Sequence, residues 1–186
     1  TTGTSNVTIG GHAYVYGITI KCGTGAGAPV MFFGGTASSW LKFESCAFQI
    51  LATGSAGGFS VGSATTNLSM HVEWINCTLQ VSAAGQLVKM RSSLEWRDTA
   101  SAITGATLPT TLFSVSTTTA GSVAVTVHGV DLSALGSGNN LVNVASLRRS
   151  LFRFIDCKLG ASVSLTTGAN NSQAGAVVQL DNCDSA

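Results

Sequence analysis

The amino-acid sequence predicts an all-β fold in which short parallel strands stack into a solenoid with three strands per coil. Three observations predict it. An aromatic residue recurs three positions before a cysteine, apolar and polar residues alternate around this pair, and a small polar residue or glycine stands directly before the cysteine. Such recurrence is typical of repeat architectures, in which each unit buries its apolar face against neighbouring units.

The repeat is clearest at 40–50 (WLKFESCAFQI), 71–81 (HVEWINCTLQV) and 151–161 (LFRFIDCKLGA). When the cysteine position is taken as an anchor, further copies follow at steps of 22 to 31 residues. The chain therefore holds about six to seven coils of about 27 residues. The anchors are Ile18, Cys46, Cys77, Thr99, Val130, Cys157 and Cys183.

The first strand of each coil lies just before the anchor. The residues three and five positions before the anchor are apolar in every copy, and the residue between them is mostly polar. The apolar residues are Val15, Phe43, Trp74, Trp96, Val127, Phe154 and Leu180, and Ala13, Leu41, Val72, Leu94, Val125, Phe152 and Val178. The residues between them are Tyr14, Lys42, Glu73, Glu95, Thr126, Arg153 and Gln179. This alternation with a period of two predicts a half-buried strand.

A bend and a second strand follow the first. The position directly before the anchor holds only Gly, Ser, Asn or Asp, which tolerate left-handed backbone angles or bond their own backbone. These bend residues are Gly17, Ser45, Asn76, Asp98, Gly129, Asp156 and Asn182. The apolar pattern resumes two positions after the anchor, at Ile20, Phe48, Leu79, Leu132 and Leu159.

A third strand is expected where the second and fourth residues of a short segment are again apolar. The segments are 30–33, 58–61, 87–90, 112–115 and 141–144. The distance from the anchor to this strand is nearly constant, whereas the distance to the next first strand varies. One corner of the coil is therefore fixed in length, and another is free to carry loops such as 62–69 and 116–122.

The solenoid explains why aromatic residues recur before the cysteines. Phe43, Trp74, Trp96 and Phe154 fall in one inward column, with Trp74 directly over Trp96, and burial of each ring stabilises the fold by about 2–3 kcal/mol. The cysteines are expected to fill the corner beside the bend as small apolar side chains. The alternative is a disulfide between Cys46 and Cys77 or between Cys157 and Cys183, because stacked residues lie within bridging distance.

The segments FESC, WINC and FIDC, with their flanking apolar columns, resemble the right-handed single-stranded parallel β-helix of pectate-lyase-like proteins and tailed-phage tailspikes. The resemblance covers roughly residues 12–186, after a lead-in at 1–11, and implies a single β-helix domain. It implies an architecture and carries no catalytic signature. Because the last repeat stops after its first strand and bend, we expect this domain to be a segment of a longer chain, continued or covered by another subunit.

Composition argues against several classes of partner. Charged residues make up 9% of the 186 residues, and the net charge is +1. Ordinary soluble domains carry about a quarter charged residues. The sequence therefore predicts no nucleic-acid binding. It also predicts no membrane insertion, because no apolar run approaches the ~18 residues of a membrane helix.

Glu73 and Glu95 are the candidates for catalysis, since stacking would put both on the outer face about 5 Å apart, near the carboxylate separation of retaining glycosidases. The competing interpretation is a mixed-sign surface ladder with Lys42, Glu44, Arg97 and Arg153 on the same face. We expect that ladder and no catalytic site. No cofactor and no metal are expected, because His12, His71 and His128 do not share one column and Asp98, Asp131 and Asp156 lack a calcium-repeat spacing.

Two groups of residues are candidates for binding. Arg148, Arg149 and Arg153 could hold an acidic glycan or the carboxylates of a partner, or form a solvated corner. Tyr14, Tyr16 and Phe32 are expected at outward positions, which suits stacking on sugars or packing against a neighbouring subunit.

The expected function is that of a structural or receptor-binding virion protein of a tailed bacteriophage, such as a tailspike, a fibre or a capsid-decorating protein. It would be assembled in the bacterial host cytoplasm, and its contacts would come from the variable loops. The resemblance implies a homotrimer, with other virion proteins and a host surface glycan as further partners. The alternatives are a polysaccharide-degrading lyase or glycosidase and a bacterial surface adhesin.

Overall fold

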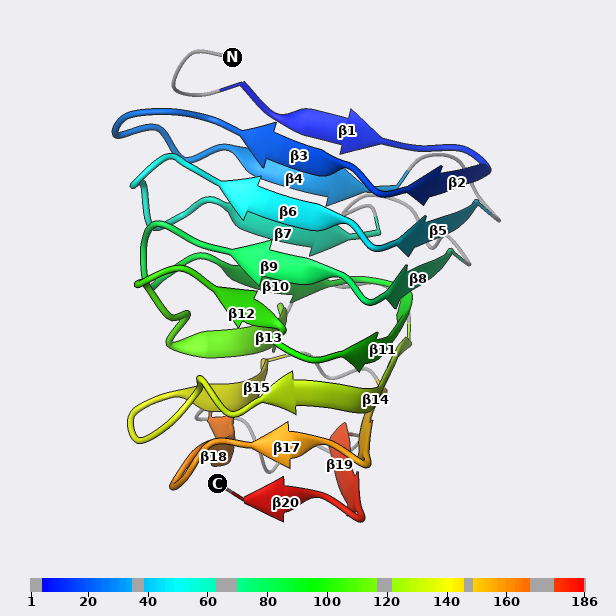
Figure 1. The fold of residues 1–186 in the computed structure, drawn as a ribbon, viewed down its shortest axis with the longest axis vertical. Coiled ribbons are helices and arrows are strands. Elements are labelled where there is room, and N and C mark those ends of the chain that lie inside the picture. Colours follow the sequence, from blue (N-terminus) through cyan, green and yellow to red (C-terminus); the bar gives the residue numbers. More distant parts are fainter. Residues whose placement is uncertain are drawn as a thin grey trace.

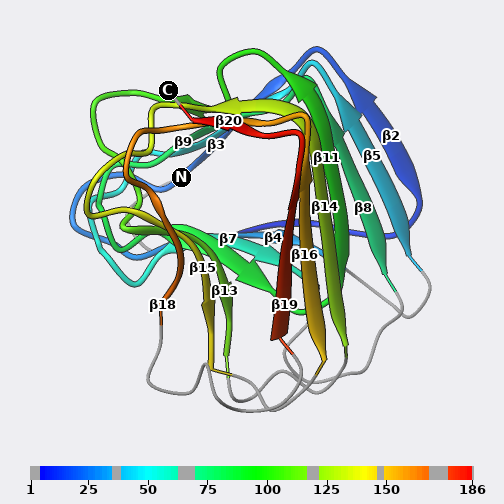
Figure 2. The same cartoon turned by 90° about the horizontal axis from the view of Figure 1, so that it is seen from below.

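The structure is a computed structural model that describes residues 5–34, 39–62, 70–116, 122–145, 149–167 and 176–185. Its regular secondary structure, within these residues, is β-strand (Figure 1). The chain visits three sheets in turn and then returns to the first, one level further along the molecule (Figures 1 and 2). The result is a parallel β-solenoid of about five turns with three strands per coil, which confirms the predicted architecture at this level.

The first sheet contains the strands that precede the bends. They are β2 (Ala13–Tyr16), β5 (Trp40–Glu44), β8 (His71–Ile75), β11 (Ser93–Thr99), β14 (Val123–Leu132), β16 (Ser150–Ile155) and β19 (Ala176–Asp181). Each pairs in parallel with the equivalent strand one coil away, and the register matches the sequence columns, as in Phe43 with Trp74 and Trp74 with Trp96.

The second sheet follows the bend, and the third sheet closes the coil. The second sheet contains β3 (Thr19–Cys22), β6 (Ala47–Ile50), β9 (Thr78–Gln80) and β12 (Ile103–Thr104), and β17 (Lys158–Leu159) pairs with the end of β14 and with β20 (Asp184–Ser185). The third sheet contains β1 (Val7–Ile9), β4 (Val30–Phe33), β7 (Gly58–Val61), β10 (Leu87–Met90), β13 (Thr111–Val115), β15 (Asn140–Val144) and β18 (Ser164–Thr167). The five predicted third strands are thus confirmed.

The bend column is confirmed in every coil. All seven bend residues have positive φ, from 50° at Asn76 and Asn182 to 69° at Gly17. Asn and Asp tolerate this left-handed conformation better than other residues with a side chain. The bends also bond one another along the stack: the Ser45 amide donates to the Ile75 carbonyl at 2.9 Å, and Asn76 Nδ2 donates to Ser45 Oγ at 3.2 Å.

The inward columns form one continuous core. Trp74 and Trp96 are fully buried and meet edge to face, with ring centroids 5.6 Å apart and planes at 84°. Phe33 of the third sheet packs against Trp74 at 5.1 Å, so rings from two sheets interdigitate across the interior. In the outermost coils, Ile18 and Leu180 stay 46% and 44% exposed, because they have neighbours on one side of the stack only.

In the coil anchored by Cys77, a buried side-chain amide holds the corner between the second and third sheets. Gln86 is fully buried, and its Nε2 donates to the carbonyls of Ala52 at 2.6 Å and Gly54 at 3.1 Å. Its Oε1 accepts from the amides of Ser82 and Ala83. One side chain therefore satisfies backbone groups in two successive coils, and an added residue would displace them.

Three strands depart from the sequence pattern. β1 lies in the expected lead-in, and β18 (SLTT) lacks the apolar fourth residue that marks the other third strands. In the coil anchored by Thr99, the second strand starts late: Ile103 pairs with Leu79, because Ala100 and Ser101 are two extra, exposed residues after the anchor. Whatever the strand propensity of their own sequences, these segments form strands because a paired strand in a neighbouring coil supplies their hydrogen bonds.

Trp96 explains why threonine interrupts the cysteine column at position 99. The Trp96 Nε1 donates to the Cys77 carbonyl and to Thr99 Oγ1, both at 3.0 Å. Among the described residues, Trp74 Nε1 is buried without any hydrogen-bond partner. A buried indole N–H normally requires an acceptor, and the hydroxyl supplies one that a thiol would supply less well.

Trp96→Phe should therefore lower the free energy of unfolding by about 1–2 kcal/mol more than Trp74→Phe. Both changes remove the same ring volume, but only the first abolishes two hydrogen bonds. Urea denaturation of the two variants measures the difference. Adding Thr99→Val should cost less in the Trp96→Phe background than in the native chain, and equal costs in both backgrounds would contradict the hydrogen-bond explanation.

Candidate functional site

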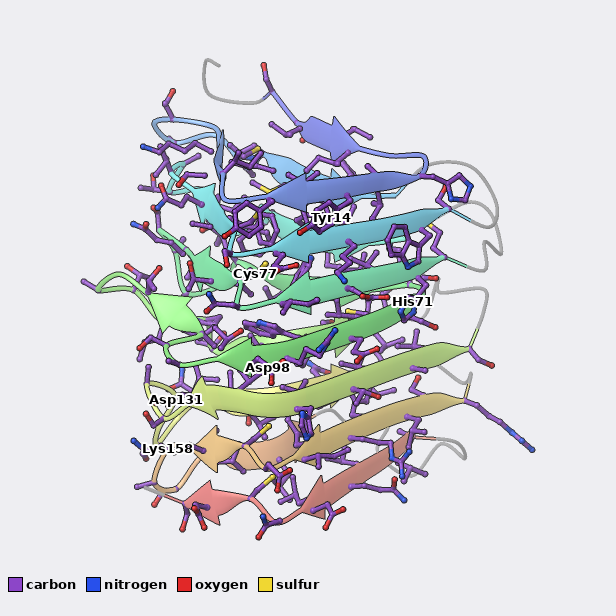
Figure 3. The ribbon with its side chains drawn as sticks, turned by 45° about the vertical axis from the view of Figure 1, so that its right-hand side comes forward. Tyr14, His71, Cys77, Asp98, Asp131 and Lys158 are labelled. Carbon is purple, nitrogen blue, oxygen red and sulfur yellow. The ribbon has the colours of Figure 1, made fainter. Side chains whose placement is uncertain are left out.

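Glu73 and Glu95 lie side by side on the outer face of the first sheet. They are direct partners in the register of β8 and β11. His71, on the same face, joins them: its Nε2 lies 3.4 Å from Glu73 Oε1 and 4.0 Å from Glu95 Oε2 (Figure 3). The structure thus brings the two sequence candidates together and adds a histidine between them.

Cationic and donor groups surround both carboxylates. Lys42 Nζ lies 4.0 Å from Glu73 Oε2, and Trp40 Nε1 donates to Glu73 Oε1 at 3.2 Å. Arg97 Nε lies 3.6 Å from Glu95 Oε1, and its Nη1 lies 3.4 Å from Asp98 Oδ2. This is the expected mixed-sign ladder, in which Lys42 and Arg97 take part. Half-exposed pairs of this kind stabilise the fold by less than about 1 kcal/mol each.

Trp40 is a residue of this face that the sequence columns did not single out. It occupies the position six residues before the anchor, one step beyond the columns that define the strand, and its side chain is 38% exposed. The alternation with Leu41 and Lys42 was the available signal, since it places Trp40 on the outer face with Lys42.

A second row of ion pairs and hydrogen bonds lies along the bends of the later coils. His128 Nε2 lies 3.1 Å from Asp156 Oδ2, and Asn182 Nδ2 donates to Asp156 Oδ1 at 2.6 Å. On the next sheet, Lys158 Nζ lies 3.8 Å from Asp131 Oδ2 (Figure 3). Burial alone would raise the pKa of Asp131, but hydrogen bonds from Ser133 and the charge of Lys158 outweigh it and lower that pKa.

His71 belongs to the mixed-sign ladder and His128 to the second row. In the part of the chain that the structure describes, no three His, Cys, Asp or Glu side chains gather closely enough to hold a metal ion. Over the same residues, no helix has the length and apolar character needed to cross a membrane.

The cysteines are free thiols, so the disulfide alternative is wrong in this structure. Cys77 Sγ donates to the carbonyls of Phe43 at 3.5 Å and Ile75 at 3.3 Å, and Cys157 Sγ does the same to Val127 and Ile155. Burial raises the pKa of Cys77 to about 12 and that of Cys157 to about 11. A buried, protonated thiol is a poor nucleophile, so these two side chains belong to the core.

The three aromatic candidates for binding differ in their exposure to solvent. Tyr14 and Tyr16 are 55% and 63% exposed on β2, whereas Phe32 is half-buried. Tyr14 is held in place, because its hydroxyl donates to Glu44 Oε2 at 2.9 Å and Lys42 Nζ lies 5.8 Å from its ring centroid. The hydrogen bond to Glu44 is the main reason why the pKa of Tyr14 is raised.

Arg149 and Arg153 are exposed, and Arg148 lies outside the described residues. Most of the predicted contact loops, 62–69 and 116–122, also fall outside them. Among the candidate residues, Glu73, Glu95, Tyr14, Tyr16 and Arg153 lie on the outer face of the first sheet.

Comparisons with protein-family models, with curated proteins and with solved structures find no match to this chain.

The raised thiol pKa values predict a loss of stability at alkaline pH. The folded protein keeps the Cys77 and Cys157 protons to higher pH than the unfolded chain, whose thiols titrate near pH ~8.5. The thiol contribution is thus complete below about pH 8.5 and is lost as pH rises toward the folded values of about 12 and 11. We expect the free energy of unfolding to fall by roughly 1–2 kcal/mol per thiol between pH 8.5 and pH 10.

Urea denaturation at pH 8 and pH 10 measures this loss. Other groups also titrate in this range, so the comparison that matters is with Cys77→Ala, which is less stable at pH 8 but should show a smaller pH-dependent loss. A Cys77→Ala variant with the same pH dependence as the native protein would contradict the assignment.

Proposed function

We propose that the chain is a rigid structural or receptor-binding segment of a tailed-phage virion protein, such as a tailspike, a fibre or a capsid-decorating protein. The observation that carries the proposal is the core that runs uninterrupted through successive coils, from Phe43 through Trp74 and Trp96 to Phe154. A solenoid with such a core resists bending, because bending would separate paired strands on one of its three sheets. That mechanical property suits a particle that must withstand assembly and attachment.

The β-helix resemblance supports two finer proposals. The first is right-handed winding. The second is a total of six to seven coils, counting incomplete ones, since the sequence contains seven anchors. The virion, assembled in the bacterial cytoplasm, would be the site of action, and other virion proteins would contact the outer surface.

A host surface glycan is the partner that best fits Tyr14 and Tyr16. The two rings are exposed at alternate positions of one strand, about 7 Å apart along it. Tyrosine faces stack on the apolar faces of sugars, and the hydrogen bond from Tyr14 to Glu44 fixes one ring before binding. Glu44, on the neighbouring strand, would accept hydrogen bonds from sugar hydroxyls.

Purified phage particles should contain this chain, and mass spectrometry would detect it. Particles carrying Tyr14→Ala together with Tyr16→Ala should adsorb to host cells at least tenfold less, because the stacking surface is lost. Gln49→Ala, on the outer face of the second sheet, is the matched control and should adsorb normally. Absence of the chain from particles would overturn the virion assignment, and normal adsorption of the tyrosine variant would overturn the glycan contact alone.

A polysaccharide-degrading enzyme is the second candidate, favoured by the in-register pair of Glu73 and Glu95 with His71 between them. If the pair were catalytic, Glu73→Gln with Glu95→Gln would abolish depolymerisation of capsular or pectic glycans while the chain stays folded. Because both acids are held in ion pairs, we expect no depolymerisation by the native chain. Glycan cleavage that is lost in the double variant would establish the enzyme instead.

A further inference from the structure

The outer face of the first sheet changes in character along the solenoid. Three columns of outward side chains cross six successive strands from β5 to β19, and their members are paired in register. The columns read Trp40, His71, Ser93, Ala124, Leu151, Val177; then Lys42, Glu73, Glu95, Thr126, Arg153, Gln179; and then Glu44, Ile75, Arg97, His128, Ile155, Asp181. The acids Glu44, Glu73 and Glu95 lie in the earlier coils together with Lys42 and Arg97, and Arg153 and Asp181 lie in the later ones.

The apolar residues of this face are divided between its two ends in the same way. Trp40, 38% exposed, lies near one end, and Val177, 47% exposed, lies near the other. Leu151 and Ile155, both half-buried, flank Arg153. Among the described residues Arg153 has no ion-pair partner, although it is exposed on a face that carries the four acids Glu44, Glu73, Glu95 and Asp181.

We propose that this face binds a second copy of the chain in an antiparallel dimer, with the twofold axis along the strand direction between β11 and β14. Such an axis reverses the order of the coils and keeps the three columns aligned. It places Glu73 opposite Arg153 of the other copy, Trp40 opposite its Val177, and Ile75 opposite its Ile155. A twofold interface of this kind is self-complementary, so each contact occurs twice.

Charge complementarity selects this arrangement over the alternatives. A symmetry axis along the solenoid, as in the trimer implied by the resemblance, would oppose equal levels and bring Glu73 and Glu95 against their own copies. Like charges opposed across an interface cost several kcal/mol. The antiparallel arrangement opposes Glu44 to Asp181, a like-charge pair, and Arg97 to His128; both pairs lie at the bend edge of the face, where solvent screens them.

The area of this face determines how strongly the two copies are expected to associate. Six strands at ~4.8 Å spacing and five residues at ~3.3 Å rise give about 29 by 17 Å, or roughly 500 Å² per copy. The total of about 1,000 Å² is at the lower limit for a specific interface. The dimer should therefore be weak, with a dissociation constant in the micromolar range, and its formation does not depend on the virion assignment.

Sedimentation velocity over about 1–500 μM tests the proposal. The native chain should pass from monomer to dimer, and Arg153→Glu should weaken association at least tenfold, because it opposes two acids. Glu73→Arg should do the same, and the two changes combined should restore association to within about threefold of the native value, since the opposed charges are then exchanged. Lys21→Glu, an equal charge change on the second sheet, should leave association unchanged.

Glu73 has partners within its own chain, so Glu73→Arg could unfold. Val177→Glu provides an independent variant, because its position is exposed and it should lose association by facing Trp40 of the other copy. A chain that is monomeric at all these concentrations, a trimer mass, or a dimer insensitive to both Arg153→Glu and Val177→Glu would overturn the proposal.

Discussion

The structure depends on one constraint, the register between neighbouring coils. Each strand pairs in parallel with its equivalent, so a strand residue of an inner coil has a neighbour of the same column about 4.8 Å above and below it. Side chains of the same kind therefore stack on one another. Inside the solenoid this arrangement is favourable, because rings such as Phe43 and Trp74 share one dry column and interdigitate with Phe33 from the opposite sheet.

On the outer face the same register is a difficulty, because it places like charges beside one another. The sequence relieves it by alternating sign along a column, as where Lys42 is followed by Glu73. Where two acids do meet, at Glu73 and Glu95, His71 and Arg97 lie against them. Arg153 does not follow this pattern, because it is exposed and has no ion-pair partner among the described residues. It therefore points to a contact with another molecule.

The proposed function rests on the scaffold more than on any cluster of reactive groups. Cys77 and Cys157 keep their protons and fill corners, and the acids of the outer face are held in ion pairs. The described residues form a solenoid with exposed rings at Tyr14 and Tyr16 and with charges of both signs on the outer face of the first sheet. Such a molecule is suited to holding partners in fixed positions.

The sequence by itself determined the coil. Residues with a period of two, a bend column that tolerates positive φ, and a nearly constant corner length specify which side chains face inward, because each is a local property of the chain. The register of Trp74 over Trp96 followed directly. For Glu73 and Glu95 it also determined their adjacency, since stacking makes neighbours of column members.

Only the tertiary structure decided how side chains of different columns meet. His71 reaches Glu73 within its own strand and Glu95 on the next, and Trp40 donates to Glu73 from the strand before, contacts that depend on rotamers and on the pleat. The strands at Ser164–Thr167 and Ile103–Thr104 likewise form because a neighbouring level completes their hydrogen bonds. The alternation of apolar and polar residues in the sequence cannot reveal these features. It describes one strand at a time, whereas these contacts arise where several strands pack together.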